Sequence, residues 1–171
     1  MKKTFKIALC GILVALAFAL GYIEMLVPLD FIAVPGVKPG FANLVIMTAL
    51  YTLGLPYAAA VSGARMLLSF ALFGSVTSLL YSLAGGALSL TGMWAAKKSG
   101  LFGHVGVSVC GAVLHNAGQL AAAALITGST SVLYYAPVLL VSAAVFGTVN
   151  GLIVKLMILR VIPAIKKKRG L

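Results

Sequence analysis

Residues 4–27 read TFKIALCGILVALAFALGYIEMLV, and this run decides the class of fold. Its charged side chains are Lys6 near the start and Glu24 near the end. A helix that crosses a bilayer needs about 20 predominantly apolar residues, so the run predicts a membrane-spanning helix. Lys2 and Lys3 precede it as in a secretory signal peptide, but the apolar run is longer than the usual signal core of about 7–15 residues. We therefore expect a retained first helix.

The composition extends this character to the whole chain. Of 171 residues, 62% are hydrophobic and 9% are charged, whereas soluble domains carry about 25% charged residues. Such a chain cannot cover a globular surface with polar groups, so its solvent is expected to be lipid. Six helices with tight loops would use nearly all of it, which leaves no room for a soluble catalytic domain.

Glycine and proline divide the rest of the chain into five more apolar segments. The sequence thus predicts a single all-α domain over residues 1–171, an integral-membrane bundle of six transmembrane helices. The expected helices cover about residues 4–27, 40–53, 57–73, 76–96, 104–127 and 132–162.

The charge distribution predicts the orientation of this bundle. The net charge is +11, with 13 Lys and Arg against two acids. With six spans, all three basic clusters fall on one side, and Lys38 is the basic loop residue on the other. Cytoplasmic loops are enriched in Lys and Arg, so we expect a multi-pass protein of the cell membrane with both termini in the cytoplasm. The basic charge is explained by topology, and nucleic-acid binding is not expected. The clusters are Lys2, Lys3 and Lys6; Lys97 and Lys98; and Arg160 with Lys166, Lys167, Lys168 and Arg169.

Small residues recur along the first expected helix. Gly11, Ala15 and Ala19 are spaced four apart and form a ridge on one face. In lipid, small residues let helix backbones approach closely. The ridge either packs inside the bundle or docks against another membrane protein.

Arg65 lies midway along the third expected helix. A charged residue at that depth costs about 2.5–3.5 kcal/mol on insertion scales, so it usually faces the protein interior and has a function. Glu24 could reach it from the outer end of the first helix. Structural pairing with Glu24 and binding of an anionic ligand are both open, and they are compatible.

A second polar cluster lies in the middle of the fifth expected helix. His115 and Gln119 are four residues apart and share a face, and Asn116 lies on an adjacent face. The cluster either joins helices by hydrogen bonds or lines a substrate cavity. No cysteine or acid stands at ligand spacing from the two histidines, so we expect no metal site and no cofactor.

Residues 35–43, PGVKPGFAN, form a turn that feeds the second expected helix. A helix that starts near Pro39 would point unpaired N–H groups, with Lys38 beside them, toward the outer face, which suits an anion. A simple turn is the alternative. On the same side, Tyr81 and Tyr135 are either interfacial residues or a pocket wall. With Asn43, these features predict a ligand pocket in the outer half of the bundle.

Five segments together resemble the Gx transporter family, also labelled heptaprenyl diphosphate synthase component I. The matching segments are GVKPGFAN at 36–43, LYTLG at 50–54, LLYSLAGG at 79–86, GAVLHNAGQ at 111–119 and YYAPVLL at 134–140.

That family is in turn similar to the substrate-binding S components of energy-coupling factor (ECF) transporters. These are six-helix proteins that capture vitamins or precursors outside the cell and pass them to a transmembrane coupling subunit and ATPases. Their first helix docks through an Ala-xxx-Ala motif, which Ala15 and Ala19 match. The resemblance implies an ECF S-component-like fold, with such a coupling subunit and ATPases as partners.

The two family labels imply different functions. Prenyl diphosphate synthases hold magnesium-bound diphosphates with several carboxylates, but this chain has one Asp and one Glu, and it has no phosphate-binding loop of an ATPase. We therefore expect no enzyme. The first hypothesis is a substrate-binding subunit for uptake of a small anionic or amphipathic molecule. Lys38 and Arg65 would hold its negative group, His115, Asn116 and Gln119 would contribute hydrogen bonds, and Tyr81 and Tyr135 would cover its apolar surface. Asn43 is a further candidate binding residue.

The second hypothesis is a non-catalytic accessory subunit for polyprenyl diphosphate or prenyl-quinone synthesis. A third is a purely structural partner in a membrane complex.

Overall fold

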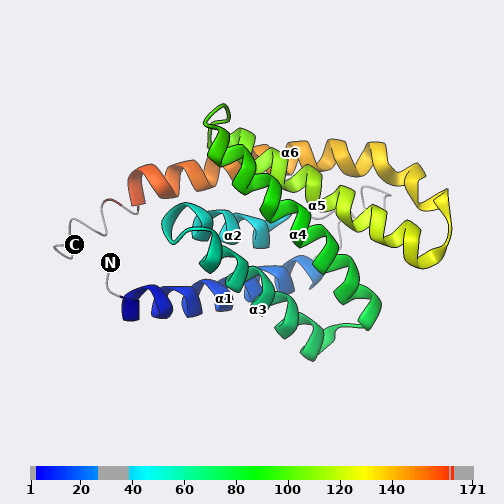
Figure 1. Cartoon of the computed structure of the whole chain (residues 1–171), viewed down its shortest axis with the longest axis horizontal. Helices are drawn as coiled ribbons and strands as arrows, with labels where there is room; N and C mark the ends of the chain where they lie inside the picture. The colour runs from blue at the N-terminus through cyan, green and yellow to red at the C-terminus, as the bar shows by residue number, and fades with distance from the viewer. Residues whose placement is uncertain (1–2, 27–38, 162, 164–171) are drawn as a thin grey trace.

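The computed structural model describes residues 3–26, 39–161 and 163. Within these ranges every regular element is helical, as Figure 1 shows. The described residues do not include Val27, Asp30, Lys38 or the basic residues 166–169. The helices are α1 (Lys3–Leu26), α2 (Phe41–Thr52), α3 (Leu55–Phe73), α4 (Val76–Ser99), α5 (His104–Thr127) and α6 (Ala136–Leu156), with a 3₁₀ turn η2 (Thr130–Tyr135) before α6 and a π-helical turn η3 (Met157–Val161) after it.

The expected multi-pass membrane class is confirmed, but the helices differ in length. Five helical stretches are long and apolar enough to cross a membrane: α1, α3, α4, α5 and the stretch Thr130–Arg160 that contains α6. In contrast, α2 has 12 residues, a rise of about 18 Å, against a hydrocarbon core of about 30 Å. Among the described residues there are thus five helices of spanning length and one short apolar helix, where the sequence predicted six spans.

The short helix α2 occupies the centre of the bundle. It packs against α1, α3, α4, α5 and α6, whereas α1 packs only against α2 and α3 within the described chain. Its side chains are buried almost all round, with Val45, Ile46, Met47 and Leu50 each at most 2% exposed. A helix that is apolar on every face is expected in such a central position.

Glycines bring α5 close to both of its neighbours. A Cβ on Gly118 would lie 2.8 Å from the carbonyl oxygen of Ala84 in α4. A Cβ on Gly151 of α6 would lie 2.7 Å from the Cα of Val105. These approaches are possible only without a side chain, as is common between helices in lipid, and they fix α5 between α4 and α6.

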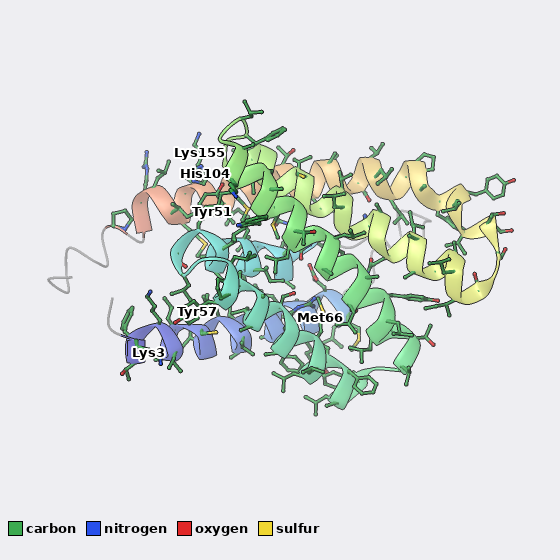
Figure 2. All side chains as sticks on the ribbon, in the orientation of Figure 1. Lys3, Tyr51, Tyr57, Met66, His104 and Lys155 are labelled. Atoms are coloured by element: carbon green, nitrogen blue, oxygen red, sulfur yellow. The ribbon has the colours of Figure 1, made fainter. Side chains whose placement is uncertain are left out.

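The first turn of α1 and the end of α6 lie at the same end of the bundle (Figure 1). Figure 2 shows Lys3, Tyr51, Tyr57, His104 and Lys155 at this end. We call it the basic end; the segments 74–75 and 128–135 define the opposite, far end. The basic end takes its name from Lys3, Lys6, Lys97, Lys98 and Lys155.

The C-terminal end of α2 is fixed at the basic end. The Lys97 ammonium donates a hydrogen bond to the Leu50 carbonyl oxygen at 2.8 Å, and it lies 4.5 Å from the centroid of the Tyr51 ring. A cation at the last carbonyls of a helix also interacts favourably with the helix dipole. Because α2 is short, its N-terminus then lies inside the bundle rather than at the far end.

The small-residue ridge faces away from the helices that the structure describes. Gly11, Ala15 and Ala19 are exposed, whereas Leu13 and Ala17 are the residues that α1 buries. A Cβ on Gly11 would meet nothing within 4 Å. Of the two interpretations of the ridge, packing inside the bundle is therefore not seen among the described helices, and docking stays a prediction.

Candidate functional site

A cavity of about 110 Å³ lies at the N-terminal end of α2. All six α-helices or the residues just before them contribute to its wall. The lining consists of Gly21 and Glu24 from α1; Pro39, Gly40, Ala42 and Asn43 at the start of α2; Arg65 from α3; Ser82 from α4; Ala112, His115, Asn116 and Gln119 from α5; and Ala143 and Phe146 from α6. In Figure 2, Met66, the neighbour of Arg65, marks this level of α3 midway along the bundle.

Asn150 of α6 holds the start of α2 in place. It is 4% exposed, and its Nδ2 donates to the carbonyl oxygens of Pro39 at 2.8 Å and Gly40 at 3.3 Å. Gly40 has φ +74°, a left-handed conformation that glycine adopts at little cost. This turn gives the cavity its wall of Pro39, Gly40, Ala42 and Asn43.

Glu24 caps α2 from the neighbouring helix. Its Oε1 accepts a hydrogen bond from the backbone N–H of Phe41, the first residue of α2. A carboxylate at this position interacts favourably with the positive end of the helix dipole. The sequence predicted that the N-terminal N–H groups of this helix would suit an external anion, but the chain's own carboxylate already binds the Phe41 N–H.

Arg65 presents a guanidinium to the same space. Its Nε is buried and makes no hydrogen bond with the described residues, while the charge of Glu24 attracts it through space. Gly21 leaves room for the group, because a Cβ there would lie 3.4 Å from Arg65 Nη1. Both predicted roles of Arg65, interaction with Glu24 and contact with a ligand, are thus compatible with its position.

The polar residues of α5 form the opposite wall. His115, Asn116 and Gln119 all line the cavity. Asn116 also joins helices, since its Nδ2 donates to the Leu139 carbonyl oxygen of α6 at 2.8 Å. Phe146 adds an apolar face beside these groups.

The predicted binding residues divide into three groups. Asn43, Arg65, His115, Asn116 and Gln119 come together around the cavity.

The two predicted tyrosines are not part of this wall. Tyr81 is half-buried outside the lining, and Tyr135 is 48% exposed in η2 near the far end. The expectation that they form the wall of this cavity is therefore corrected: Tyr81 precedes the lining residue Ser82 but lies on another face of α4, and Tyr135 lies in η2. Lys38, the remaining predicted residue, is outside the described chain.

Other wall residues carried weaker signals in the sequence. Gly21 contributes space because it has no side chain, and Ser82 contributes a hydroxyl group. Neither residue carries a charge that would stand out in an apolar helix. Asn150 stands out as a polar residue in an apolar helix, but its partner is 111 positions away. The described residues contain no group of three or more His, Cys, Asp or Glu side chains that could hold a metal ion.

Comparison with known proteins adds one match. Residues 13–157 match the family described as heptaprenyl diphosphate synthase component I, a range that contains every residue of the cavity wall. No curated protein and no solved structure matches the chain.

Proposed function

The chain belongs to the heptaprenyl diphosphate synthase component I family, and from this premise we propose that it is a non-catalytic membrane subunit that captures a small polar molecule in the cavity at the start of α2. The observation that carries the proposal is the convergence of polar groups from α1 to α5 on one cavity inside a membrane bundle. Polar groups at that depth are costly and usually functional.

In the proposed cycle the protein acts like the S component of an ECF transporter. The basic end faces the cytoplasm of the cell, in line with the enrichment of Lys and Arg in cytoplasmic loops. The ligand enters from the far side of the membrane and is held near Arg65 and His115. A coupling subunit and ATPases on other chains supply the energy, and the exposed ridge of Gly11, Ala15 and Ala19 is the docking face.

A second candidate function is an accessory subunit for polyprenyl diphosphate or prenyl-quinone synthesis. The description of the family favours it, because it names a component of a synthase. In that case the partner is a soluble synthase that carries the Asp-rich catalytic motifs, and this chain holds or anchors a substrate at the membrane.

Ligand capture is tested by thermal unfolding of the purified protein with and without a small-molecule extract of the cells that produce it. A molecule that binds the folded state raises the melting temperature. We expect the extract to raise it for the wild type and for Tyr134→Ala, since Tyr134 is 86% exposed and outside the cavity wall. Arg65→Ala and His115→Ala should remove the effect; an undiminished effect in both would refute the cavity as the binding site.

The partner is tested by affinity purification from the native membrane. A coupling subunit with ATPases supports the transport role, whereas an Asp-rich synthase supports the accessory role. Ala15→Trp places a large side chain on the exposed ridge, so we expect it to abolish recovery of the coupling subunit and to leave ligand-induced stabilisation intact. Unchanged recovery would exclude the ridge as the docking face.

A further inference from the structure

The connection between α4 and α5 places exposed apolar side chains beside an exposed cation. Trp94 and Lys98 lie near the end of α4, and Leu101 and Phe102 precede α5; we call these four residues the α4–α5 corner. We propose that the corner binds an anionic phospholipid, with the lipid phosphate at Lys98 and an acyl chain beside Trp94 and Phe102. This surface is separate from the cavity, so the proposal does not rest on the proposed function.

The cation and the largest aromatic side chain of the corner share one face of α4. Trp94 and Lys98 are four residues apart, a spacing that places two side chains on the same face of a helix. The Lys98 ammonium lies 5.0 Å from the centroid of the Trp94 ring. Lys98 is exposed, and Trp94 is 39% exposed. A phosphate can therefore reach the ammonium while a hydrocarbon chain lies along the indole ring.

The apolar surface continues beyond the end of α4. Leu101 is 85% exposed and Phe102 is 53% exposed with respect to the described residues. The Phe102 ring lies against the first turn of α5, since a Cβ on Gly106 would be 3.1 Å from Phe102 Cδ1. Both α4 and α5 are long and apolar enough to cross a membrane. The corner that joins them is therefore expected at the boundary between hydrocarbon and headgroups.

The positive charge of the basic end has few acidic side chains to offset it. The cations described at this end are Lys3, Lys6, Lys97, Lys98, Lys155 and Arg160. The whole sequence contains two acidic residues, Glu24 and Asp30, and Glu24 lines the cavity at the start of α2. At most one acidic side chain is thus left for all of these cations. The sequence after Pro163 adds further Lys and Arg but no acid.

The position of the corner favours a lipid over a soluble partner. Figure 2 shows His104, which begins α5 directly after the corner, at the basic end with Lys155. Anionic leaflets attract Lys and Arg beside spanning helices, and tryptophan is enriched at the membrane interface. A soluble acidic protein or a nucleic acid would match Lys98, but Trp94 belongs to a helix of spanning length. An anionic phospholipid offers a phosphate and a hydrocarbon chain in one molecule, and so matches both residues.

Fluorescence quenching tests the proposal, because Trp94 is the single tryptophan of the chain. The full chain is reconstituted into phosphatidylcholine vesicles that contain the same low mole fraction of brominated phosphatidylglycerol or of brominated phosphatidylcholine. Bromine on an acyl chain quenches a neighbouring indole. We expect brominated phosphatidylglycerol to quench Trp94 at least about twice as strongly, because its anionic headgroup is attracted to Lys98. Unbrominated phosphatidylglycerol should reverse this quenching, and unbrominated phosphatidylcholine should not.

Variants of Lys98 locate the preference at the corner. Lys98→Gln should abolish the difference between the two brominated lipids, whereas Lys98→Arg should retain it. Lys3→Gln is the matched control, since it makes the same change in charge on an exposed residue of α1 at the same end, and it should keep the difference. Each variant is compared with and without bromine, so a direct effect of the Lys98 ammonium on the indole cancels.

Equal quenching by the two brominated lipids in the wild type would overturn the proposal and would leave the corner to a soluble acidic partner. A preference that survives in Lys98→Gln would also overturn it. An equal loss in Lys98→Gln and Lys3→Gln would contradict a site at the corner, because the attraction would then come from the net charge of the basic end. If Lys98→Gln does not fold, the competition between unbrominated lipids in the wild type still decides, and equal competition by both would overturn the proposal.

Discussion

Gly118 illustrates how single residues set the distance between helices in this protein. A Cβ at this position would lie 2.8 Å from the Ala84 carbonyl oxygen and 2.9 Å from the Cα of Gly85, and both are backbone atoms that cannot turn aside. Because α5 carries His115 and Gln119 to the cavity, a displacement of α5 from α4 would also move the site.

We therefore predict that Gly118→Ala lowers the free energy of unfolding by about 1–3 kcal/mol, the usual cost of overpacking. Gly63→Ala is the matched control, since a Cβ there meets nothing within 4 Å and alanine favours the helix. Unfolding of both variants in the same detergent provides the measurement. An equal effect of the two substitutions would contradict the close approach of α4 and α5.

At the residue scale, the sequence predicted the site where a side chain is chemically conspicuous. Arg65, His115 and Gln119 were found because charged and polar residues are rare inside membrane helices. Gly21 was not predicted, because its role is to leave space for the Arg65 guanidinium, and a glycine gives no chemical signal for that role in the sequence. Tyr81 and Tyr135 lie outside the wall of this cavity, because membrane depth from the sequence does not tell which face of a helix points to the cavity.

The element on which the site depends is α2, which is held through its backbone at both ends. Glu24 and Asn150 bind its first turn and the residues before it, and Lys97 binds its last turn. The three side chains come from α1, α6 and α4. The short helix is therefore fixed by its neighbours rather than by the membrane boundaries.

The contact of Lys97 with α2 gives a prediction at this scale. Lys97→Met should lower the free energy of unfolding by about 1 kcal/mol or more, because it removes a charged hydrogen bond and the cation at the end of α2. Lys98→Met is the control, since Lys98 is exposed and lies over the Trp94 ring instead. Chemical denaturation of both variants measures the difference. Equal free energies of unfolding would show that the contact of Lys97 with the end of α2 does not stabilise the protein.

Element boundaries were predicted well where glycine and proline mark them. The stretch 104–127 coincides with α5 as the structure has it. In contrast, the predicted helix 132–162 divides into η2, α6 and η3, because a 3₁₀ turn and a π-helical turn leave the apolar pattern unchanged. The length of α2 was visible in the sequence, but its position at the centre was not, since that position results from long-range contacts.

For the whole molecule, the family and the all-helical membrane class followed from the sequence and were confirmed.

The orientation of the bundle in the membrane is still a prediction, and it can be tested at the two ends of the bundle. Leu101 is 85% exposed between α4 and α5 near the basic end, and Thr130 is exposed at the far end. In a background in which Cys10 and Cys110 are replaced by alanine, a membrane-impermeant maleimide should label Thr130→Cys in intact cells. Leu101→Cys should react only after permeabilisation, and the reverse pattern would invert the proposed direction of capture.

The central claim is that the cavity at the start of α2 holds a small molecule through Arg65, and native mass spectrometry of the purified protein tests it most directly. The account predicts that the wild type and Lys98→Gln carry a small non-covalent ligand, and that Arg65→Gln has lost it while it remains folded. A wild type that carries no such mass, or an Arg65→Gln variant that carries it at the same occupancy, would contradict the account.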